Sequence, residues 1–276
     1  MIEMIPALYA LLLGLLIGSF LNVCISRWPL DLSVVSPRSR CPGCERPITW
    51  YENIPVVSWL ALRGKCRGCA NPISPIYPVI ELLVGALWLA SALAFGPTFL
   101  ALRVAIFATI LLGIAVTDLK HYLIPDGFTV FGFIWHLLAA GIAWTLGDGT
   151  LFAGPWDALL GACVGAGAIA ITGWLGEVAM KKEAMGFGDV TLMAMVGAAL
   201  GPGRALLTIF VGALIGAVVF VGIVYPVSWL RSRRSDAAFE PPLVPFGVFL
   251  APAALVTLLW GNDFIRWYRD SILLGM

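Results

Sequence analysis

The sequence predicts an all-α polytopic membrane protein, with about eight transmembrane helices and a small cytosolic domain between helices 1 and 2. Hydrophobic residues form 60% of the 276-residue chain and charged residues 12%, against about 45–50% and 25% in soluble proteins. With a mean hydropathy of +0.94, a soluble protein of this size would have too few polar side chains to cover its surface. A net charge of +1 also argues against a nucleic-acid-binding protein, which needs a basic surface.

Eight apolar runs carry this prediction, because a helix crosses the bilayer core with about 20 apolar residues. The runs cover residues 5–25, 76–95, 98–117, 128–147, 157–180, 187–200, 204–226 and 244–260. The first run is not expected to be a cleaved signal peptide, because it lacks a basic leader and has no small-residue cleavage pattern after it. Strands of a membrane β-barrel are excluded because they would alternate with period two.

The chain therefore has three predicted parts: helix 1 at 1–25, an extramembrane domain at 26–75 and a seven-helix membrane domain at 76–276. The extramembrane domain is rich in Pro, Cys and basic residues and has no apolar run of membrane length. With eight spans, thirteen of the seventeen Lys and Arg residues fall on its side of the membrane and three on the other. Because basic loops stay in the cytosol, this domain is predicted to be cytosolic.

Four cysteines in this domain form two CxxC pairs, Cys41-Pro-Gly-Cys44 and Cys66-Arg-Gly-Cys69. Two such pairs supply four thiolates to one tetrahedral Zn²⁺. Two disulfides are the alternative, but the cytosol keeps thiols reduced. We therefore expect a structural zinc site, because four thiolates leave no open position for a reacting water.

Acidic residues in apolar spans are expensive and are functional candidates by default. Glu81 and Arg103 lie in adjacent spans, and a structural ion pair is the favoured interpretation. Asp118 ends the third run and Asp189 begins the sixth, so the predicted topology places both at the cytosolic edge of the membrane.

The sixth run opens with Gly186-Phe-Gly188-Asp189. The two glycines would let a substrate or a helix approach Asp189 closely. Two carboxyl groups at one depth could share a proton, so that one activates water and the other protonates the peptide. Alternatively, each Asp only caps a helix.

The Gly-x-Gly-Asp sequence matches the signature of intramembrane aspartyl proteases, and the chain resembles their type IV prepilin leader peptidase branch from about residue 14 to 251. The resemblance rests on ordered blocks, which are Gly18-Ser-Phe-Leu-Asn22, Cys41-Pro-Gly-Cys44, Trp50 to Trp59, Leu62-Arg-Gly-Lys-Cys66, Pro72-Ile-Ser, Tyr77-Pro-Val-Ile-Glu81, Asp118, Ile124-Pro-Asp126, Gly186 to Asp189 and Pro245-Phe-Gly247. Two positions depart from the family pattern: Ile76 stands where Arg is usual, and Val248 where a second Pro is usual.

The resemblance implies a bacterial inner-membrane enzyme that removes the basic leader of prepilins or pseudopilins at the cytosolic face. It also implies methylation of the new N-terminus with S-adenosylmethionine. Asp118 and Asp189 would be the catalytic pair, with Gly186, Gly188 and Asp126 as supporting motif residues. No S-adenosylmethionine site can be assigned, although the run 62–66 and Glu52 are candidates by location.

Two other functions stay open at this point. An ion- or proton-coupled transporter would use intramembrane acids as a relay, and an assembly factor would use the zinc domain to bind partners. A metalloprotease is not expected, because the chain has two histidines and no HExxH motif. Small-residue runs at 14–18, 161–165 and 212–216 mark either a dimer face or helix contacts within one chain, so the oligomeric state is not predicted.

Overall fold

The structure, a computed structural model, describes residues 4–147, 151–181, 185–235 and 244–273. Seven of the described helices are long and apolar enough to cross a membrane, and a shorter apolar helix covers Phe187–Leu200. The seven are Ile5–Leu30, Ile76–Phe95, Phe99–His121, Asp126–Leu146, Pro155–Ala179, Pro202–Leu230 and Gly247–Ile272. Together with the shorter helix Phe187–Leu200, these seven match the eight predicted runs in order, which confirms the predicted fold class.

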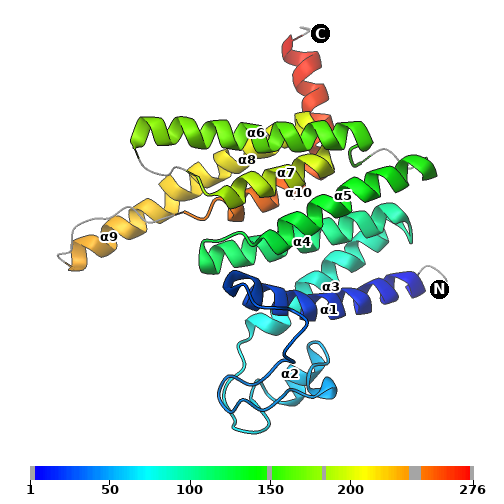
Figure 1. Cartoon of the computed structure of the whole chain (residues 1–276), viewed down its shortest axis with the longest axis vertical. Helices are drawn as coiled ribbons and strands as arrows, with labels where there is room; N and C mark the ends of the chain where they lie inside the picture. The colour runs from blue at the N-terminus through cyan, green and yellow to red at the C-terminus, as the bar shows by residue number, and fades with distance from the viewer. Residues whose placement is uncertain (1–3, 148–150, 182–184, 236–243, 274–276) are drawn as a thin grey trace. The chain divides into compact units, whose positions relative to one another are not determined.

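The chain divides into two compact units, Met1–Gly113 and Ile114–Met276. In the first unit, α1 (Met4–Arg27) packs alongside α3 (Ile76–Phe95) (Figure 1). The contact is close because glycines of α1 face α3: a Cβ added at Gly14 would lie 2.9 Å from the Cα atom of Gly85. The small-residue run of this helix is therefore a contact within the chain.

Between α1 and α3 the chain forms the predicted extramembrane segment. Its short helices are η1 (Trp28–Leu30), η2 (Trp50–Glu52) and α2 (Val57–Ala61), joined by loops rich in Pro, Gly and Cys. Two isolated antiparallel bridges, Arg40 with Pro47 and Lys65 with Pro72, each close one hairpin-like loop. These loops lie together beside α2 (Figure 1).

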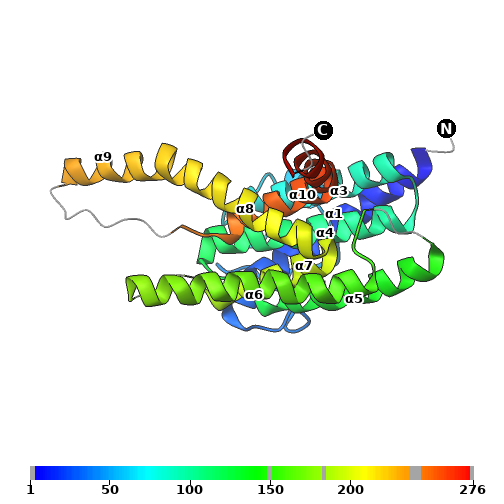
Figure 2. The same cartoon turned by 90° about the horizontal axis from the view of Figure 1, so that it is seen from above.

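The helix α4 (Phe99–His121) crosses the boundary between the units, and the described part of the second unit then continues with six further α-helices. They are α5 (Asp126–Leu146), α6 (Pro155–Met180), α7 (Phe187–Leu200), α8 (Pro202–Val219), α9 (Tyr225–Ser235) and α10 (Gly247–Tyr268). In this unit α6 packs along α7, and α8 packs against α10. Figure 2 shows α8 continuing into α9 through the π-helical turn Phe220–Val224.

The runs at 204–226 and 244–260 underestimate their helices. The first continues to Ser235 and the second to Tyr268. Both continue because the residues that end the apolar pattern are largely charged or polar side chains, which keep the helical hydrogen bonds. Gly261 lies inside the second helix without ending it. In the same way α4 runs past residue 117 to His121, so that Asp118 lies in its last turn.

Candidate functional site

Asp118 is buried at a junction between α4 and the start of α10. Asp118 is 5% exposed, and its Oδ2 atom accepts a hydrogen bond of 3.2 Å from the backbone N–H of Val248. A helix N-terminus is a favourable place for an anion, because its first N–H groups lack partners within the helix. The adjacent Gly247 is tightly placed, since an added Cβ would lie 2.9 Å from Oδ2 of Asp118.

Asp189 lies in the first turn of α7 and is 9% exposed. Ile124 packs against both Gly188, the residue before Asp189, and Gly247, which contacts the Asp118 carboxylate, so the fold brings the two acids into one neighbourhood within the second unit. Both residues are candidates from the sequence, and Val248 stands there as a departure from the family pattern, but its contact with Asp118 is not predicted. That contact joins positions 130 residues apart and comes from the backbone, which carries no residue-specific pattern.

The two glycines beside Asp189 have different surroundings. A Cβ on Gly188 would lie 2.9 Å from the Cβ atom of Ile124, in the segment that follows Asp118, whereas a Cβ on Gly186 would meet no atom of the described residues within 4 Å. Gly188 thus lets α7 approach the α4–α5 connection, and Gly186 has no close neighbour among the described residues. Asp126, the other predicted motif residue, is exposed in the first turn of α5.

This difference gives a matched pair of variants. We expect Gly188→Ala to destabilise the protein by about 1–3 kcal/mol, the usual cost of overpacking, because the new methyl group overlaps Ile124. Gly186→Ala should leave stability unchanged, since its backbone φ of −75° suits any residue. Thermal unfolding of both purified variants checks this, and equal melting temperatures would contradict the assigned contact.

The four cysteine sulfurs of the predicted metal site come together in the first unit. The Sγ atoms of Cys41, Cys44, Cys66 and Cys69 lie within 4.8 Å of one another. Those of Cys41 and Cys69 are 3.7 Å apart, close to the spacing of about 3.8 Å that a tetrahedron with Zn–S bonds of about 2.3 Å requires. The residues can therefore hold a metal ion.

An ion pair between Arg46 and Glu52 lies beside this cluster, because Gly68 in the second CxxC pair is close to both Arg46 and Cys44. Arg46 donates to both carboxylate oxygens of Glu52 at 2.7 and 2.8 Å, and the N–H and hydroxyl of Thr49 donate to the same carboxylate. The Arg46 hydrogen bond lowers the pKa of Glu52 to about 2, so Glu52 is charged at neutral pH. The charge of Glu52 is thus neutralised by a cation of the same domain, Arg46.

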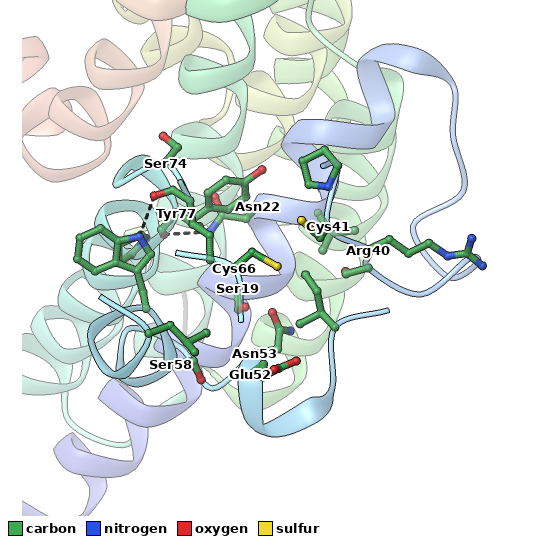
Figure 3. A pocket seen from close by; sticks show the side chains of 18 of the residues that line it. Ser19, Asn22, Arg40, Cys41, Glu52, Asn53, Ser58, Cys66, Ser74 and Tyr77 are labelled. Carbon is green, nitrogen blue, oxygen red and sulfur yellow. Dashed lines mark hydrogen bonds between the residues drawn. The ribbon is translucent and has the colours of Figure 1, made fainter. Parts of the chain in front are cut away.

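A cavity of about 510 Å³ lies between the cysteine domain and helices α1 and α3, entirely within the first unit. Its lining includes Asn22 and Tyr77, which are joined by a hydrogen bond of 3.0 Å from Asn22 Nδ2 to the Tyr77 carbonyl oxygen. Figure 3 shows Asn22, Glu52, Asn53 and Cys66 around it. Of the residues predicted by location, Leu62, Cys66 and Glu52 line the cavity, whereas Lys65 is exposed and outside the lining.

Glu81, at the same cavity, is not paired with Arg103. Its carboxylate accepts a hydrogen bond of 2.7 Å from the N–H of Val56, and the ion pairs among the described residues do not include it. The predicted ion pair is therefore wrong. Adjacent spans fix which helices are near each other, but not which faces meet.

Comparison with known proteins gives matches over most of the chain. Residues 12–95 match the family described as bacterial peptidase A24 N-terminal domain, and residues 105–221 match the type IV leader peptidase family. No solved structure matches.

Curated relatives carry the name prepilin leader peptidase/N-methyltransferase. One from Myxococcus xanthus is 42% identical over 85% of this chain and 68% of its own length. One from Aeromonas hydrophila is 35% identical over 98% of this chain and 97% of its own. One from Pseudomonas aeruginosa is 36% identical over 95% and 92%. The chain belongs to the type IV leader peptidase family.

Proposed function

We propose that this protein is an aspartyl endopeptidase that removes the basic leader of type IV prepilins or pseudopilins, with Asp118 and Asp189 as its catalytic pair. The observation that carries the proposal is that two buried carboxyl groups lie at helix ends in one unit, beside glycines that both pack against Ile124. The names of the relatives support the peptidase over a proton-coupled transporter or an assembly factor.

The arrangement suits acid–base hydrolysis. One carboxylate activates a water molecule, while the protonated partner donates first to the peptide carbonyl oxygen and then to the leaving amine. The Val248 N–H holds Asp118 in position, and Gly186 leaves space beside Asp189, where an extended substrate backbone would fit.

Incubation of the purified protein with a prepilin peptide that spans the leader junction tests this function. We expect a product shortened at the head of the apolar segment. A peptide left intact under conditions in which the protein stays folded would contradict the proposal.

We infer that the cysteine domain and the aspartates face the cytosol from a bacterial inner membrane. The excess of Lys and Arg on that side supports this orientation. A prepilin has a basic leader before an apolar helix, so its cleavage point would lie at the same membrane edge as the aspartates.

We further infer that the four cysteines bind a structural Zn²⁺. The purified protein should contain one zinc per chain. Cys41→Ser should lose the metal and make residues 26–75 sensitive to protease, because a small segment with little apolar core depends on its metal. Cys163→Ser is the matched control, since Cys163 is exposed on α6. Full zinc content in Cys41→Ser would contradict the site.

Methyl transfer to the new N-terminus is the second proposed activity, and S-adenosylmethionine is the proposed methyl donor. When bound, this cofactor supplies a methyl group on a positively charged sulfur. The cavity below the cysteine domain has a volume of about 510 Å³, within the range of about 300–1,000 Å³ of small-molecule sites. Its polar lining from Asn22, Asn53 and Ser74 supplies hydrogen-bonding groups for such a ligand. Calorimetric binding of S-adenosylhomocysteine tests the site, and no binding would contradict it.

A further inference from the structure

The cavity contains two acidic side chains whose surroundings differ. Glu52 has a cationic partner in Arg46 at 2.7 Å. Glu81, in the second turn of α3, is 8% exposed, and its carboxylate accepts a hydrogen bond from a neutral donor, the N–H of Val56. A buried carboxylate without a cation is costly, so Glu81 is the group in this cavity that a positively charged ligand would satisfy.

The backbone is strained at the point where it donates to Glu81. Val56 has φ 61° and ψ −49°, a conformation that is unfavourable for a β-branched residue. The N–H of Val57 donates to the carbonyl oxygen of Pro55 at 2.6 Å, which makes Val56 the centre of a γ-turn of the rare, strained kind. Such strain collects at functional sites, and here it directs the Val56 N–H at one carboxylate of the cavity.

The carboxylate has capacity for a further donor. Two carboxylate oxygens offer about four acceptor positions, and the Val56 N–H occupies one of them. The depth also fits a particular cation: Glu81 lies five residues, or about 7.5 Å of helix rise, inside the start of α3 at Ile76. An amine at the head of an apolar helix would lie at a similar depth.

We propose that Glu81 binds the N-terminal ammonium of the processed pilin and accepts the proton that this group must lose before methylation. This inference rests on the proposed methyl transfer. With the proton on Glu81, the amine nitrogen uses its lone pair to form the C–N bond, and the C–S bond breaks with its electron pair left on sulfur. The product is a secondary ammonium that keeps its two N–H protons, and the one proton that the reaction releases passes from Glu81 to water.

The test measures binding in the absence of the methyl donor. The full-length protein in detergent is titrated with two peptides of the mature pilin N-terminus, one with a free amine and one acetylated. The wild type should bind the free amine about tenfold more tightly or better, the usual value of a hydrogen bond between charged groups. Glu81→Gln should abolish the difference, because glutamine keeps the Val56 hydrogen bond and loses only the charge.

Ser19→Ala is the matched control. It changes a neutral side chain in the lining of the same cavity and leaves the charge of Glu81, so the preference for the free amine should persist. Zinc content reports whether the domain stays folded in each variant. A preference that persists in Glu81→Gln would overturn the assignment. So would a Glu81→Gln variant that loses affinity for S-adenosylmethionine but not for S-adenosylhomocysteine, because Glu81 would then bind the positive sulfur.

Product methylation separates this inference from the activity on which it rests. If the wild type methylates its product and Glu81→Gln does so at the same rate, the role of Glu81 is wrong and methyl transfer stands. If the wild type with bound S-adenosylmethionine leaves its product unmethylated, the proposed methyl transfer itself fails.

Discussion

Asp118→Asn and Asp189→Asn are each expected to reduce leader cleavage by about a thousandfold or more, the scale of losses for residues that act as a catalytic unit. Asparagine has nearly the same shape as aspartate, but it can neither activate water as a base nor donate the proton that the leaving amine needs. Cleavage of a prepilin peptide, measured as initial rates, gives the result.

Folding must be separated from chemistry in these variants. Both side chains are buried, so each variant is compared with the wild type by thermal unfolding and zinc content. Asp263→Asn is the matched control, because Asp263 is exposed on α10 and pairs only with Arg266 at the surface. Substantial cleavage by either dyad variant would contradict an aspartyl mechanism.

The largest effect on stability is expected at the crossing of α6 and α7. A Cβ on Gly161 would overlap the carbonyl oxygen of Gly197 and lie 2.7 Å from the Cα atom of Gly201, and a Cβ on Gly197 would overlap the backbone of Gly161. Gly161→Ala or Gly197→Ala must therefore move two helix backbones apart. We expect a loss of at least about 1–3 kcal/mol, together with reduced cleavage because α7 carries Asp189.

Gly167→Ala is the control on the same helix. Nothing lies within 4 Å of a Cβ at Gly167, so this variant should unfold at the wild-type temperature. Thermal unfolding in detergent measures all three variants. If Gly161→Ala is as stable as Gly167→Ala, the two helices do not cross at Gly161 and Gly197.

The helices that the sequence predicts best have clear ends. The predicted ranges 76–95 and 187–200 agree with α3 and α7, because Pro75 and Gly96 bound the first and Gly186 and Gly201 the second. The length of the last helix was underestimated because its apolar run ends at residue 260, whereas the helix continues to Tyr268. Residues such as Asp263 and Arg266 leave the apolar pattern and stay helical.

The side chains of the candidate sites could be predicted from the sequence. The backbone groups that contact them could not. The spacing of the cysteines and the positions of Asp118 and Asp189 can be read from the sequence. The N–H groups of Val248 and Val56 cannot, because any residue but proline carries one. Val248 is instructive, since the usual Pro at that position in the family would remove the donor to Asp118.

Mass spectrometry of a processed prepilin N-terminus tests the central claim most directly. With the wild-type protein and S-adenosylmethionine, the substrate should lose its leader and gain one methyl group on the new N-terminal amine. With Asp118→Asn or Asp189→Asn, the leader should remain attached. A substrate that the wild type leaves uncut, or that these variants cut at the wild-type rate, would contradict the account.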